Sequence, residues 1–102
     1  MTIYNKLVRD RIPEIIEQSG KHCKTRVLSF EEYELSLRKK LAEEVEEYLT
    51  SNDSNELADI IEVVYALAEL HKINPEELEY IRLEKAKIRG GFEQRIFLES
   101  VE

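Results

Sequence analysis

The sequence predicts an all-α fold, a four-helix, bundle-like arrangement in a single domain of residues 1–102. Three observations predict it. A chain of 102 residues has the length of one domain. Its composition, 42% hydrophobic and 36% charged, is that of a helix-rich globular protein. Its three Gly and two Pro fall at the ends of the helical patterns, where such residues start or stop helices.

The first helix is expected over about residues 10–19. Asp10 is the predicted cap, and Gly20 suits the position after the last turn. The segment 25–29, "TRVLS", is too short for a helix and rich in β-branched and aliphatic residues. These residues are typical of a strand. A short β pair of 25–29 with 94–98, "QRIFL", is therefore a candidate element beside the four helices.

The second helix is expected over about residues 30–50. Ser29 and Glu32 have the S-x-x-E spacing of a capping box, in which each residue satisfies a backbone N–H of the other. A polar turn, "TSNDSN" at 50–55, follows. Such short connections favour antiparallel neighbouring helices.

The third and fourth helices are expected over about residues 54–71 and 75–89. The fourth begins with "NPEE", in which Asn74 is the cap and Pro75 the first helical residue. The glycine pair at 90–91 ends it.

Two of these helices carry acidic residues one turn apart. Apolar side chains cover an arc of about 220° on the third helix at 100° per residue, and Glu56 lies inside this arc with Asp59 at its edge. Glu44 and Glu47 are likewise three apart on the second helix. A buried carboxylate needs a compensating cation or several donors. Two such helices can surround a hard cation, and Mg²⁺ accepts both carboxylate and phosphate oxygens.

Two simpler interpretations of these acids remain open. The run "EEVEE" at 43–47 is also what a solvated helix face looks like, paired with basic residues one turn back (Arg38, Lys39 and Lys40). Asp53 and Glu56 also have capping-box spacing, which would give Glu56 a purely local role.

The distribution of charge excludes some functions. Residues 30–79 hold 15 Asp/Glu and four Lys/Arg, so no basic stripe is available for nucleic acid, and no nucleic-acid partner is expected. No apolar run approaches the length of a membrane span, so no membrane partner is expected. A single cysteine, Cys23, favours a reducing compartment, and the expected location is the cytoplasm.

With these residues in place, the sequence resembles the MazG-like all-α nucleoside triphosphate pyrophosphohydrolases. The signature of that superfamily is E-x-x-E on one helix and E-x-x-D on the next. The likeness to its phosphoribosyl-ATP pyrophosphohydrolase-like, house-cleaning branch covers nearly the whole chain. It is carried by "YNKLVRDRIP" (4–13), "KLAEEVEEYL" (40–49), "ELADIIEVVYAL" (56–67) and "EKAKIRGGFEQRIFL" (84–98).

The resemblance implies hydrolysis of a nucleoside triphosphate between its α and β phosphates, giving a monophosphate and pyrophosphate. It implies that Mg²⁺, with Mn²⁺ as an alternative, is held by Glu44, Glu47, Glu56 and Asp59. Only eight residues separate Glu47 from Glu56, fewer than is common in the superfamily, so a tight turn is expected there.

Other residues are candidates around this site. Glu43 is a candidate for orienting or deprotonating the attacking water beside Glu44 and Glu47, with a plain solvent-facing role as its alternative. Arginine grips phosphate oxygens in pairs and lysine acts as a point charge. The candidate phosphate or base cradle is therefore Lys6, Arg9, Lys85 and Arg89, each with a surface-charge alternative.

The broad apolar arc of the third helix exceeds what a monomer of this size needs, so a homodimer or dimer of dimers is expected. Two rival functions stay open. One is phosphoribosyl-ATP cleavage in histidine biosynthesis. The other is a non-catalytic helical module that binds a nucleotide or a protein.

Overall fold

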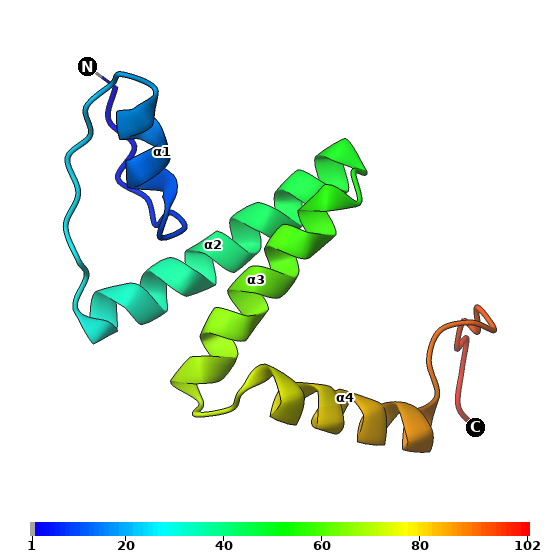
Figure 1. Ribbon diagram of the computed structural model, residues 1–102. Coiled ribbons are helices and arrows are strands. Elements are labelled where there is room, and N and C mark those ends of the chain that lie inside the picture. The colour runs from blue at the N-terminus through cyan, green and yellow to red at the C-terminus, as the bar shows by residue number, and fades with distance from the viewer. Residues whose placement is uncertain (1) are drawn as a thin grey trace.

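The computed structural model describes residues 2–102, and those residues form four helices and no strand. The helices are α1 (Ile12–Gln18), α2 (Phe30–Ser51), α3 (Asn55–Leu70) and α4 (Pro75–Arg89). The all-α prediction is confirmed. Figure 1 shows α2 and α3 as a long antiparallel hairpin, with α1 beyond a loop on one side and α4 leading away from the far end of α3.

The local signals for α2 and α4 act as expected. Ser29 and Glu32 form a reciprocal capping box at the start of α2, and Asn74 and Glu77 form another at the start of α4. A positive φ of 82° at Gly90, which glycine adopts without steric cost, ends α4. Both helices therefore begin and end where their sequences predict.

The prediction for the start of α1 was wrong. Arg11 takes the N-cap position in place of Asp10, and no side chain caps the helix. Pro13 occupies the first turn, where its missing N–H costs nothing. The helix is only seven residues long, so its position depends on the chain around it.

The predicted β pair of 25–29 with 94–98 was also wrong, because no strand forms within residues 2–102. The first segment lies in the loop before α2, where Val27 is 97% exposed, and the second follows α4. Figure 1 shows these loops at opposite ends of the molecule. β-branched residues favour extended backbone, but an isolated strand pair is only marginally stable even when its segments meet.

The tight turn between α2 and α3 positions the site. Only residues 52–54 connect the two helices. Asn52 adopts the left-handed conformation with φ 57° and closes the end of α2 through its N–H to the Tyr48 carbonyl. Asparagine is among the few non-glycine residues that adopt this conformation readily. The turn brings the end of α2 directly beside the start of α3.

The core within one chain is small. Its buried apolar side chains within residues 2–102 are Leu37, Val63 and Ala68. The radius of gyration is 18.0 Å, whereas a compact domain of this length has about 13 Å. On α3, one part of the apolar arc packs against α2, and another part, Leu57, Ile61 and Tyr65, stays exposed. None of the helices in residues 2–102 has both the length and the apolar character that a membrane crossing requires.

The start of α2 supplies a testable pH dependence. Glu32 accepts hydrogen bonds from the Arg26 guanidinium, at 2.9 Å, and from the Ser29 N–H, and together these lower the pKa of Glu32 from 4.5 to about 2. A lowered pKa stabilises the fold above the ordinary pKa, and this contribution is lost as the pH falls through the folded-state value. Glu32→Gln should lower the Tm at pH 6, and this difference from the parent should shrink steadily towards pH 2. Thermal melts followed by circular dichroism measure it, with Glu31→Gln as control. A difference that does not change with pH would contradict it.

Candidate functional site

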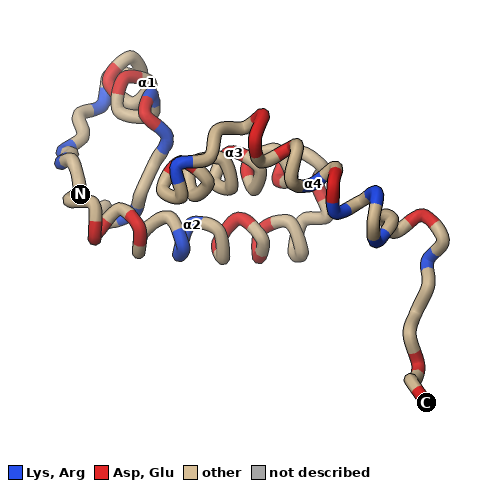
Figure 2. Tube along the Cα trace, turned by 90° about the horizontal axis from the view of Figure 1, so that it is seen from below, with Lys and Arg blue, Asp and Glu red and all other residues tan. Residues whose placement is uncertain are grey.

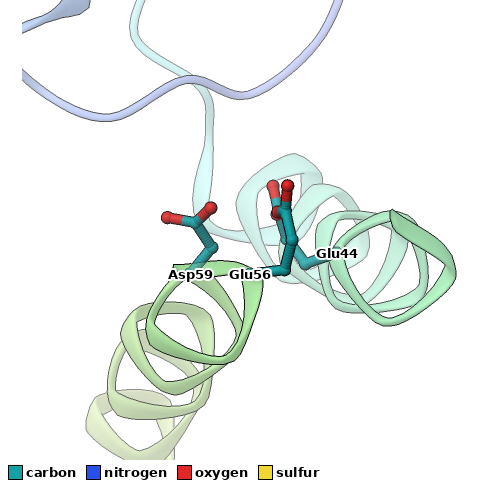
Figure 3. Close-up of side chains that lie close together, drawn as sticks. All are labelled: Glu44, Glu56 and Asp59. Carbon is teal, nitrogen blue, oxygen red and sulfur yellow. The ribbon is translucent and has the colours of Figure 1, made fainter. Parts of the chain in front are cut away.

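Three carboxylates meet where α2 and α3 lie side by side. Glu44 comes from α2, while Glu56 and Asp59 come from the first two turns of α3. Each offers an oxygen that lies within 4.8 Å of the oxygens of the other two. Figure 3 shows the Glu44 and Glu56 side chains next to one another, with Asp59 on the same side of α3. We call these three residues the acidic cluster.

The acidic cluster is partly withdrawn from water and incompletely satisfied. The Glu44 side chain is only 9% exposed, and Glu56 and Asp59 are half-buried. One oxygen of Glu44 and one of Glu56, Oε2 in each, are buried without a hydrogen-bond partner. A buried acceptor without a donor from the protein is costly, and such oxygens usually bind an ion or an ordered water. The cluster is therefore short of positive charge or of donors.

The pKa of Glu56 also indicates that the acidic cluster lacks positive charge. Burial raises the pKa of Glu56 above its ordinary value, and the negative charge of Glu47 and the nearby carboxylates of Asp59 and Glu44 raise it further. These carboxylates repel one another, as like charges at close range must. A cation among them would remove that repulsion.

The local capping interpretation of Glu56 is wrong. Ser54 is the N-cap of α3, and no side chain caps the helix. The Asp53 carboxylate accepts a hydrogen bond from the Asn55 N–H at 2.9 Å, which is a turn interaction that does not involve Glu56. Glu56 is thus left without the local role that its spacing from Asp53 suggested.

Two basic side chains contact the acidic cluster. Arg9 donates from Nη2 to Asp59 Oδ1 at 2.6 Å, and this contact brings the N-terminal segment to the site. Lys40 Nζ lies 3.2 Å from Glu44 Oε1, one turn back on α2, and both side chains are largely buried. Arg9 was a predicted site residue. Lys40 was expected only as a partner on a solvated face, and its four-residue spacing from Glu44 was the available signal.

The remaining predicted residues lie outside this cluster. Glu47 is exposed and is not one of the three grouped carboxylates, although its charge acts on Glu56. Glu43 is exposed on α2. Lys6 lies over the ring of Tyr4, with 5.6 Å from Nζ to the ring centroid.

Lys85 and Arg89 are exposed on α4, which approaches no helix other than α3 within residues 2–102. Figure 2 shows acidic positions along α2 and α3, and basic positions in the N-terminal segment and towards the end of α4. The single chain therefore does not bring the basic residues of α4 to the acidic cluster.

The chemistry of this arrangement is that of a hard-cation site. Carboxylate oxygens are the ligands that Mg²⁺ and Mn²⁺ prefer, and Mg²⁺ usually takes only a few of them and keeps waters or phosphate oxygens at its other positions. Glu44, Glu56 and Asp59 fit this donor set, because two of their oxygens are buried and unpaired. Exposed acidic groups often gather without an ion, so the buried unpaired oxygens are the more telling feature.

Comparisons with known proteins add little to this description. No family model matches the chain, and no solved structure matches it. An uncharacterized protein of Mycolicibacterium smegmatis is 49% identical to it over 53 residues, which are 52% of this chain and 53% of that protein. The matched part thus spans about half the length of this relative. This relative does not indicate an activity, so the function is argued mainly from the acidic cluster.

Proposed function

We propose that the protein is a Mg²⁺-dependent nucleoside triphosphate pyrophosphohydrolase that cleaves between the α and β phosphates, with nucleotide-pool house-cleaning in the cytoplasm as its role. The observation that carries the proposal is the convergence of three carboxylates from two antiparallel helices within 4.8 Å, with buried unpaired oxygens on Glu44 and Glu56. The resemblance of the flanking sequence to MazG-like enzymes supports the choice of reaction.

The acidic residues have distinct parts in this proposal. Glu44, Glu56 and Asp59 hold the cation, and Glu47 joins them from the exposed rim. Bound Mg²⁺ would offset charge on the phosphate oxygens and orient a water. Attack of a water on the α-phosphorus would break the α–β anhydride bond and give a nucleoside monophosphate and pyrophosphate. Glu43 is the proposed acceptor of the water proton, and its exposure leaves it accessible to such a water.

The basic residues supply contacts to the substrate. Arg9 contacts the acidic cluster through Asp59, and a guanidinium is a group that can bind phosphate oxygens in a bidentate manner. Lys6, Lys85 and Arg89 complete the proposed cradle. Lys85 and Arg89 lie on a helix that is set apart in the single chain. This fits a homodimer or dimer of dimers in which α3 and α4 lie near the interface.

A panel of ordinary and modified nucleoside triphosphates, together with phosphoribosyl-ATP, tests the proposal by detection of released pyrophosphate. We expect pyrophosphate release that requires Mg²⁺ and stops in EDTA. Preference for phosphoribosyl-ATP would move the assignment to histidine biosynthesis. If no substrate is cleaved and Mg²⁺ with triphosphate gives no thermal shift, the proposed hydrolysis is wrong, and a non-catalytic module that binds a protein becomes the favoured function.

A further inference from the structure

The ion pair between Arg9 and Asp59 differs from the other ion pairs in residues 2–102. It joins groups 50 residues apart, whereas each of the others joins groups no more than six residues apart. It is also the contact between the N-terminal segment and a member of the acidic cluster. Neither its spacing in the sequence nor any local motif requires it.

The two cations at the acidic cluster are held very differently. Lys40 comes from the same helix as Glu44, and its side chain is 19% exposed, so it is a fixed part of the site. Arg9 comes from a segment outside the helices, and its side chain is 54% exposed. An exposed pair is worth little in free energy, because both partners are well solvated when apart. Arg9 can therefore leave Asp59 at small cost.

Two carboxylate oxygens of the cluster lack a partner even with both basic side chains present. The Glu44 side chain is about nine-tenths buried, and its Oε2 has no donor although Lys40 pairs with Oε1. Glu56 Oε2 is likewise buried and unpaired. A divalent cation that used these oxygens and Asp59 would repel a guanidinium on the same carboxylate.

We propose that Arg9 is an exchangeable placeholder: it neutralises Asp59 in the metal-free protein and gives up that carboxylate when a divalent cation enters the acidic cluster. Its guanidinium is then free to bind phosphate oxygens of the substrate. The exchange at Asp59 needs only a divalent cation, and the transfer to phosphate rests on the proposed function.

The proposal predicts opposite effects of one substitution on two ligands. Arg9→Gln removes a competitor for Asp59, so Mn²⁺ alone should bind about fivefold more tightly, the free-energy scale of an exposed ion pair. In the presence of saturating Mn²⁺, the same variant should bind an α,β-methylene triphosphate at least about fivefold more weakly, because a charge-assisted contact to phosphate is lost. Mn²⁺ binding is measured by electron paramagnetic resonance and triphosphate binding by calorimetry.

Arg11→Gln is the matched control. It removes the same charge two residues away, from an arginine that pairs with Glu14 of α1 and not with the acidic cluster. We expect it to behave as the parent towards both ligands. Unchanged or weaker Mn²⁺ binding by Arg9→Gln would overturn the placeholder role and leave the proposed hydrolysis intact if the parent still cleaves triphosphates. A parent that binds no Mn²⁺ would overturn both.

Discussion

Replacement of Glu44 by glutamine is expected to lower Mg²⁺-dependent pyrophosphate release by about 100-fold or more, since loss of even an outer partner of a metal ligand typically costs 10–100-fold. The side chain keeps its size, but it loses its negative charge at the buried carboxylate and, on the proposed function, Mg²⁺ would lose a ligand. Initial rates over a range of Mg²⁺ concentrations measure the effect. Raising Mg²⁺ should recover part of the activity if the variant binds the ion weakly.

Two further variants are needed to separate a loss of metal binding from a loss of stability. Glu44→Gln also leaves Lys40 without its partner in a largely buried position, so its Tm must be compared with that of the parent. Asp59→Asn alters a more exposed member of the acidic cluster and should lose activity with little loss of Tm. Glu46→Gln, which changes an exposed acid of the same helix, should match the parent. Parental rates in both Glu44→Gln and Asp59→Asn would refute the site.

The parent is expected to behave in solution as a dimer or dimer of dimers, and Ile61→Glu is expected to reduce it to the single chain of 12.0 kDa. Ile61 is 49% exposed in one chain and lies in an apolar row with Leu57 and Tyr65 along α3. A charge placed in a buried apolar interface has a large desolvation cost. Size exclusion with light scattering measures the mass, and Glu62→Gln on the same helix should leave it unchanged. A monomeric parent, or an Ile61→Glu variant of parental mass, would contradict the interface.

Local sequence signals predicted much of the fold. The Ser29–Glu32 capping box and the Asn74–Pro75 start are interactions among residues within one turn, so they need no contact with distant parts of the chain. Gly90 acts through its own backbone. The expected turn between α2 and α3 followed from its length alone.

The wrong predictions were of two kinds: a β pair that depends on distant segments, and two helix caps, at Asp10 and at Asp53 with Glu56, that are local. The β pair needed segments that the helices hold at opposite ends of the molecule. The capping role of Glu56 had the right spacing, yet Ser54 became the N-cap. The Arg9 contact to Asp59 could not be read from spacing, because the loop before α2 decides where the N-terminal segment lies. The helix wheel did place Glu56 beside Asp59, but only packing against α2 shows that Glu44, and not Glu47, completes the group.

The uneven packing of the four helices has a consequence for motion. Resistance to local opening follows the density of buried contacts, so amide hydrogens of the α2–α3 hairpin should exchange with solvent most slowly, and those of α1 and α4 should exchange sooner. The carboxylates therefore reside on the most rigid unit, whereas Arg9, Lys85 and Arg89 reside on parts that rearrange easily. If the proposed function is right, such a division would let the groups that contact the nucleotide adapt to it while the geometry of the carboxylates stays constant.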